Sequence, residues 1–279
     1  MNQEIRLPWR IEAFGEYLTF ETLQPAAAVL SLFEGERFSP QNPEIQKLHR
    51  MLEERTNKSA WVPKRSGAES LNWNIEGDVT RNKGRVFTSM LIMYPKEWED
   101  NKIRLTQFGK ALASGKIDKS EYYDFLLKNF SYPHPAWKDN WTSWTKANRT
   151  LYPFIYIIQV LLILYQNSKL SAYLTTEEIA DHLHNDPDHS KVKTKANKIL
   201  EAREKKSPST TPRSDEIHRK ISDIMRFLCL TKYCYYDGHS IALNTLDYHQ
   251  LENVTFTGKR KGQDKIKDIE DLITIEGGK

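Results

Sequence analysis

The chain has 279 residues, of which 39% are hydrophobic, and it carries a net charge of +4. A chain of this size can bury substantial cores and suggests about two globular domains. The first ten residues lack the apolar stretch of a secretory signal, and the apolar run at residues 151–165 is shorter than the roughly 20 residues that cross a membrane. The composition therefore argues against a membrane partner and predicts a soluble, cytoplasmic protein, in which Cys229 and Cys234 are reduced structural thiols.

The N-terminal residues 1–19 predict an extended arm, because Pro8 disfavours a helix and no alternation of apolar residues supports a strand. Gln3, Arg6 and Arg10 have side chains suited to reading bases in a DNA groove. A basic terminus that is simply solvated is an equally good interpretation of the same residues.

Residues 20–115 predict a first folded unit. Apolar residues at helical spacing indicate helices over residues 25–33 and 43–55. A basic loop with a hydroxyl group follows, and we expect its Lys64, Arg65 and Ser66 to contact phosphates.

The same unit is predicted to continue with a helix over residues 78–90 that turns its apolar side chains to the core. Strands over residues 91–94 and 102–106 are then expected to pair as a hairpin. The polar side chains of the helix face outward and are candidates for reading bases: Arg81, Asn82, Lys83 and Arg85.

Residues 116–149 predict a helical and aromatic connector, with three Trp and two Pro between positions 132 and 144. A second unit over residues 150–257 then repeats the order of the first. It contains a core helix over residues 154–165 and a capping box at 175–178. A hairpin with an Asp237-Gly238 turn ends it.

Cations are concentrated between Lys191 and Lys220, where ten Lys or Arg face four acids. Within this stretch a basic, hydroxyl-rich loop leads into an amphipathic helix with apolar positions from Ile217 to Leu228. We predict that this helix reads bases, through Arg213 at its start and Arg219 on its polar face. The loop supplies the candidates for phosphate contact: Lys205, Lys206, Ser207, Ser209, Thr210 and Thr211.

Helices followed by a basic loop, a helix and a hairpin form the order of a winged helix. The fold class that we predict is therefore mainly α with short β-hairpins (α+β), built from two winged-helix, or helix-turn-helix, subdomains joined by the connector. An ordinary amphipathic helix beside a basic loop is the plainer interpretation of the second unit taken alone.

The sequence predicts no catalytic residue and no metal site. Asp188 and the Glu204-Lys205-Lys206 run match the PD-(D/E)XK nuclease pattern formally, but the residues between them are helical and lack the strand that would present both acids together. Potential metal ligands cluster from His182 to His189, where we expect a solvated loop instead. No phosphate-binding glycine loop and no nucleophile elbow occurs in the sequence.

Two stretches carry a resemblance to a known family. Residues 103–115, which contain Leu105-Thr106-Gln107-Phe108-Gly109, and the later Tyr132-Pro133-His134-Pro135 segment resemble the DNA-recognition region of BpuJI-like type IIS restriction endonucleases. The resemblance extends over nearly the whole chain, although the Leu-Thr-x-x-Gly element alone ends many winged-helix domains.

The resemblance implies a recognition module that binds a short asymmetric site in double-stranded DNA and does not itself cut. The nuclease domain, which would use Mg²⁺, is then expected beyond residues 258–279, a charged linker. The chain itself is expected to need no cofactor, to bind no small-molecule substrate and to be monomeric. Two alternatives stay open: a winged-helix regulator or replication initiator without a nuclease, and a protein-interaction scaffold.

Overall fold

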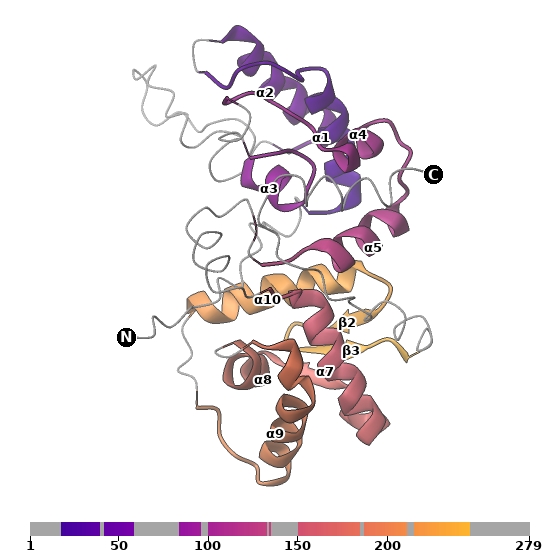
Figure 1. Ribbon diagram of the computed structural model, residues 1–279, viewed down its shortest axis with the longest axis vertical. Helices are drawn as coiled ribbons and strands as arrows, with labels where there is room; N and C mark the ends of the chain where they lie inside the picture. The colour runs from indigo at the N-terminus through magenta and orange to yellow at the C-terminus, as the bar shows by residue number, and fades with distance from the viewer. Residues whose placement is uncertain are drawn as a thin grey trace. The chain divides into compact units, whose positions relative to one another are not determined.

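The computed structural model describes residues 18–39, 42–58, 84–95, 100–132, 134, 150–184, 187–210 and 215–245. These residues divide between Tyr122 and Tyr123 into two units, which we call the N-terminal unit (described residues 18–122) and the C-terminal unit (described residues 123–245). The described part is mainly helical and includes a small antiparallel sheet (Figure 1). It confirms an α+β chain, and it contains no helix that is long and apolar enough to span a membrane.

Helix α1 is the centre of the N-terminal unit, because it packs against both α2 and α4. Leu23 and Leu30 of α1, Leu48 of α2 and Leu112 of α4 are fully buried. The unit also holds the start of α5, which continues into the C-terminal unit. The helices are α1 (Phe20–Ser31), α2 (Pro43–Thr56), α3 (Gly84–Ser89), α4 (Gln107–Ala113) and α5 (Lys119–Asn129).

The predicted strands over residues 91–94 and 102–106 are wrong, because the described backbone there forms isolated bridges instead. Met93 bridges to Leu105, and the Tyr94 N–H donates to the Arg104 carbonyl. The pairing does not extend before Met93, because Leu91 has a left-handed backbone with φ of 59°. It does not extend beyond Leu105, because Thr106 is the N-cap of a helix that the sequence did not predict.

The start of α4 is fixed by Thr106 and Gly109. The Thr106 side chain accepts the Gly109 N–H at 2.9 Å and donates to the Leu91 carbonyl, so it caps the helix and joins it to the preceding turn. A Cβ at position 109 would lie 2.0 Å from the Ile92 carbonyl oxygen. The Thr-x-x-Gly spacing therefore combines a helix cap with a close approach of two backbones.

After the end of α5, the next helix of the C-terminal unit is α7, which is so apolar that it is buried along most of its length. The predicted core helix and capping box are both confirmed. In chain order the elements are α7 (Pro153–Asn167), η5 (Lys169–Ser171), β1 (Tyr173–Thr175), α8 (Thr176–Glu178), the π-helix η6 (Ile179–His184), η7 (His189–Lys191), α9 (Val192–Glu204), α10 (Asp215–Leu230), β2 (Cys234–Tyr236) and β3 (Ser240–Leu243).

The sheet has the order β1-β3-β2, with both pairs antiparallel. The predicted hairpin is confirmed, and Gly238 takes the positive φ of 99° that its turn requires. The Asp237 carboxylate accepts the N–H groups of Ser240 and His239, which together lower its pKa to about 2. Ile241 and Leu243 face the core, as the alternation of the strand dictates.

Aromatic rings fill the core of this unit: Phe154 stacks on Phe227 at 4.4 Å between centroids, and Phe130 lies 5.1 Å from Phe154. The solvated loop predicted around His189 is wrong for that residue. Its Nδ1 lies 2.9 Å from Gln159 Oε1, and its Nε2 accepts the Tyr152 N–H at 3.1 Å. Burial lowers the pKa of His189, so the neutral ring joins η7 to α7.

Candidate nucleic-acid interface

The basic segment at residues 205–210 is exposed throughout, as its composition predicts. It starts at the end of α9, where Lys206 takes a left-handed φ of 50°. The Lys206 N–H donates to the Arg203 carbonyl, and the Ser207 N–H donates to the Ala202 carbonyl at 3.0 Å. This pair of bonds forms a Schellman motif, which fixes the direction in which the segment leaves the helix.

The far end of the segment is held by an acid. The Asp181 carboxylate on η6 accepts the Thr210 N–H at 3.1 Å and the Thr210 hydroxyl at 3.2 Å. Thr210 therefore anchors the segment in this structure, and its hydroxyl is already engaged. The exposed polar side chains between the two anchors are Lys205, Lys206, Ser207 and Ser209.

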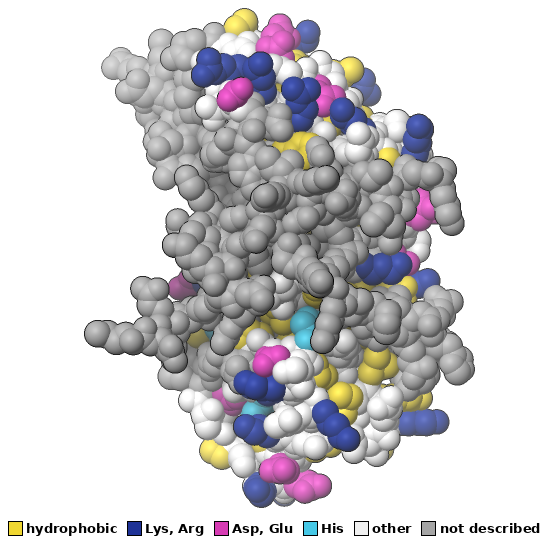
Figure 2. All heavy atoms as spheres, viewed as in Figure 1, with side chains coloured by type: hydrophobic (Ala, Val, Ile, Leu, Met, Phe, Trp, Pro, Cys, Tyr) yellow, Lys and Arg dark blue, Asp and Glu magenta, His cyan; other side chains and the backbone are white. Residues whose placement is uncertain are grey.

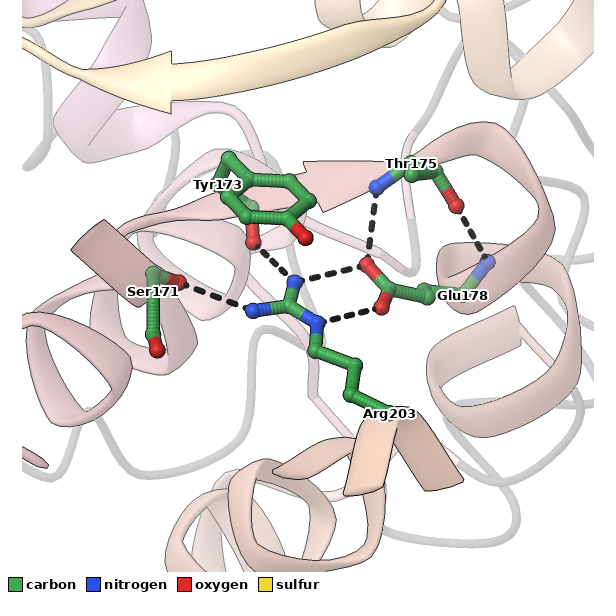
Figure 3. A network of polar contacts seen from close by, with 5 residues as sticks. All are labelled: Ser171, Tyr173, Thr175, Glu178 and Arg203. Carbon is green, nitrogen blue, oxygen red and sulfur yellow. Dashed lines mark hydrogen bonds and ion pairs between the residues drawn. The ribbon is translucent and has the colours of Figure 1, made fainter. Parts of the chain in front are cut away.

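Arg203, in the last turn of α9, pairs with Glu178, the last residue of α8 (Figure 3). Its guanidinium forms two parallel bonds to the Glu178 carboxylate, at 2.6 and 2.8 Å, and lies 3.9 Å from the centroid of the Tyr173 ring. It also donates to the carbonyls of Ser171 and Tyr173. Glu178 in turn accepts the Thr175 N–H in the capping box, so one carboxylate joins a helix cap to a second helix.

Helix α10 buries Ile221, Ile224, Met225 and Leu228, which confirms its predicted apolar face. Several charged side chains on its polar face form ion pairs with one another. Lys220 pairs with Glu216 at 2.6 Å, and Arg226 pairs with Asp223 at 3.7 Å. Arg219 is exposed on the same face.

Helix α9 presents a polar face that the sequence prediction left out. Lys193, Thr194, Asn197 and Lys198 are exposed, while Val192, Ala196 and Ile199 are buried on the opposite side. Figure 2 shows Lys and Arg side chains over the part of the unit that Figure 1 labels α9. The spacing of the apolar residues, at positions 192, 196 and 199, was the signal that could have identified this face.

Several predicted base and phosphate contacts lie outside the described residues: Gln3, Arg6, Arg10, Lys64, Arg65, Ser66, Arg81, Asn82, Lys83, Thr211 and Arg213. The backbone of Arg85 lies in α3. The structure thus brings together Lys205, Lys206, Ser207, Ser209 and Thr210 in one segment, and it places Arg219 on α10. Their contacts with DNA stay predictions.

The residues of the formal nuclease pattern are far apart. Asp188 caps η7 before α9 begins, and Glu204 is the last residue of that 13-residue helix. At 1.5 Å per residue the two acids are separated by roughly 20 Å, which is too far to share a metal ion. Within the described ranges no group of three or more His, Cys, Asp or Glu side chains is placed to hold a metal.

The fold is similar to that of an endonuclease binding domain. The solved structure is described as pyrene- and phenanthrene-modified DNA in complex with the BpuJ1 endonuclease binding domain. The likeness has a TM-score of 0.62 at 15% sequence identity and covers 90% of each chain.

The model of the family described as "Restriction endonuclease BpuJI - N terminal" matches residues 83–264, more than half of the chain. The chain belongs to this family. No curated protein matches the sequence.

Proposed function

We propose that the chain recognises a short, asymmetric site in double-stranded DNA as the DNA-binding part of a type IIS restriction endonuclease. Membership of the BpuJI N-terminal family supports this function. The observation that carries it here is the exposed segment at residues 205–210, in which Lys205, Lys206, Ser207 and Ser209 project between two backbone anchors. Cations and hydroxyls on a preorganised segment suit contact with phosphates.

We further propose that the C-terminal unit is a winged helix. The order helix α7, strand β1, helices, then the hairpin β2 and β3 supports this assignment, together with the sheet order β1-β3-β2. For the N-terminal unit the same assignment has weaker support, from its helices and the bridge between Met93 and Leu105.

Phosphate contacts would supply most of the affinity and none of the direct sequence information. Each phosphate neutralised by a lysine lowers log K by about 0.9 for every tenfold rise in salt. Base reading would fall to the exposed Arg219 and to the predicted contacts in the undescribed segments, Arg81, Asn82 and Arg213 among them.

We propose that cleavage belongs to a separate, Mg²⁺-dependent nuclease domain. This proposal is supported by the separation of roughly 20 Å between Asp188 and Glu204, because two carboxylates so far apart cannot bind the same Mg²⁺ ion. We also propose that the chain binds as a monomer in the cytoplasm. A single copy carries no two-fold axis, and it therefore suits an asymmetric site, whereas a symmetric dimer reads a palindrome.

Random-site selection with the 279-residue chain tests this function. We expect enrichment of one short asymmetric motif and no cutting of the enriched duplex when Mg²⁺ is added. Enrichment of a palindrome would favour a dimeric regulator. Failure to enrich any motif would contradict DNA-site recognition and would favour the alternative of a protein-interaction scaffold.

A further inference from the structure

We propose that Asp181 competes with DNA for the end of the basic segment at residues 205–210. In this structure its carboxylate occupies an anion-binding site that the N–H and the hydroxyl of Thr210 form together. A DNA phosphate takes the place of that carboxylate in the complex. This inference rests on the proposed function, and it adds an exchange of anions that lowers the affinity of the chain for any duplex.

The two donors of Thr210 suit an anion. Its N–H donates to Oδ2 of Asp181 at 3.1 Å and its hydroxyl donates to Oδ1 at 3.2 Å, so one residue binds both oxygens of a carboxylate. Phosphate oxygens in protein–DNA complexes accept hydrogen bonds from the same kinds of group, backbone N–H groups and threonine hydroxyls. The site can therefore bind a phosphate with the donors that it already has.

The contact between Asp181 and Thr210 is weak enough to be exchanged. Both bonds are exposed to solvent, and at 3.1 and 3.2 Å they are long for bonds to a charged acceptor, which are typically about 2.5–2.9 Å. The bonds from Arg203 to Glu178, at 2.6 and 2.8 Å, show the shorter geometry of a permanent junction in the same unit. An exposed hydrogen bond contributes little net stability, because water competes for both partners.

Asp181 is held in place by the element that carries it. It lies on the π-helix η6, whose Ile179, Ala180 and Leu183 are buried in the core. Segments of this rare geometry often occur at functional sites. Thr210, in contrast, is exposed at the end of a segment that is exposed throughout. The carboxylate is therefore the fixed partner, and Thr210 is the partner that can turn to another anion.

A phosphate and the Asp181 carboxylate repel each other at this position. Two like unit charges about 6 Å apart lower an association constant by about 3-fold at the dielectric constant of water, and by more near a protein surface. The start of the segment does not depend on Asp181, because the Schellman motif there uses the N–H groups of Lys206 and Ser207. DNA can thus replace Asp181 at one end while the other end keeps its direction.

The test measures binding of the 279-residue chain to the duplex enriched by random-site selection and to a scrambled duplex, by fluorescence anisotropy. Asp181→Asn removes the charge and keeps the shape of the side chain, and it should tighten binding to both duplexes by about 3- to 10-fold at about 0.1 M salt. The ratio of the two dissociation constants should stay at the wild-type value, because a phosphate contact carries no direct sequence information. The gain should shrink as salt screens the charge.

Glu204→Gln is the matched control. Glu204 is exposed at the end of α9, directly before Lys205, so this variant removes an equal charge beside the segment without removing a bond to Thr210. It should tighten binding less than Asp181→Asn does. In a chain that also carries Thr210→Val, which lacks the hydroxyl, Asp181→Asn should lose most of its advantage over Glu204→Gln.

The inference is overturned if Asp181→Asn binds no more tightly than the wild type, because the bonds to Thr210 would then serve to order the segment. It is equally overturned if Glu204→Gln gives the same gain, since the loss of charge alone would explain both variants. A wild-type chain that binds neither duplex would instead contradict the proposed function itself. Circular dichroism establishes that each variant is folded.

Discussion

Both units begin a helix with a threonine cap, yet the residue three positions later differs. In the N-terminal unit Thr106 accepts the N–H of Gly109, and in the C-terminal unit Thr175 accepts the N–H of Glu178 at 3.1 Å. Gly109 lets the helix touch the backbone at Ile92, while Glu178 reaches Arg203 on another helix.

The same capping geometry therefore occurs with two kinds of packing, one steric and one electrostatic. The N-terminal junction is steric, because it depends on the absence of a Cβ. The C-terminal junction is electrostatic, because it depends on a bidentate ion pair whose side chains are 18% and 16% exposed. Substitutions at the two junctions should therefore lower the free energy of unfolding for different physical reasons and by different amounts.

The largest effect is expected from Gly109→Ala. The added methyl would lie 2.0 Å from a carbonyl oxygen that belongs to the backbone and cannot rotate away. We expect a loss of about 3 kcal/mol in the free energy of unfolding, measured by urea denaturation. Gly115→Ala is the control: that site is open but has φ of +70°, so about 1 kcal/mol should be lost. Equal losses at both sites would contradict a steric junction.

Arg203→Met should come next, with a loss of about 2 kcal/mol once partial exposure is taken into account. The substitution keeps an unbranched apolar side chain of about the length of the aliphatic part of arginine but leaves Glu178 without its guanidinium. Lys205→Ala breaks the exposed pair with Glu201 on the same helix and should change stability by less than about 0.5 kcal/mol. If the two variants unfold at the same urea concentration, the Arg203 network does not hold the junction.

Acid should weaken the N-terminal unit through His49. Burial lowers the pKa of His49 from 6.5 to about 4, so the folded state holds this ring neutral while the unfolded state takes up a proton. Stability contributed by the neutral ring is complete above the unfolded pKa and is lost as pH falls, by about 2 kcal/mol at pH 5.

The pH dependence of urea unfolding between pH 7 and 5 measures this loss, and His49→Gln should make the curve flatter. His189 gives the C-terminal unit a dependence of the same sign, because burial also lowers its pKa. A curve for His49→Gln that keeps the full slope of the wild type would assign the acid sensitivity to other groups.

Removal of the caps themselves should have effects no larger than these, and the loss of the Thr175 cap should be the smallest. Thr106→Ala removes a buried hydroxyl that bonds both Gly109 and Leu91, and it should cost about 2 kcal/mol. Thr175→Ala removes one bond at a partly exposed site and should cost about 1 kcal/mol. Serine at either position keeps the hydroxyl and should recover most of the loss. If Thr175→Ala lowered the free energy of unfolding more than Thr106→Ala does, the Thr106 cap would not be the stronger of the two.

Local signals predicted the elements of the C-terminal unit well. The apolar run of α7, the capping box at Thr175 and the Asp237-Gly238 turn each depend on residues within a few positions of one another. The role of Gly109 was not predictable in this way, because the group it approaches belongs to Ile92, 17 positions earlier. Arg203 and Glu178 are likewise 25 positions apart, and no periodicity links them.

The candidate interface was predicted in part. The exposure of residues 205–210 followed from their composition, whereas the anchoring of Thr210 by Asp181 depends on a contact across 29 positions. The i, i+4 spacing of Glu216 and Lys220 is visible in the sequence, and it could have indicated that α10 pairs some of its own charges. Two predicted strands failed because the buried run at residues 91–94 does not alternate, and Leu91 turns the chain.

DNA-site recognition is tested most directly by the ratio of the dissociation constants for a scrambled duplex and for the enriched duplex. The 279-residue chain would be titrated, at 0.15 M salt, against the duplex enriched by selection and against the same bases in scrambled order. DNA-site recognition predicts that the enriched duplex binds about 10³-fold tighter or more. A ratio near one at that salt concentration would show that the cations of this chain bind phosphates without reading a site.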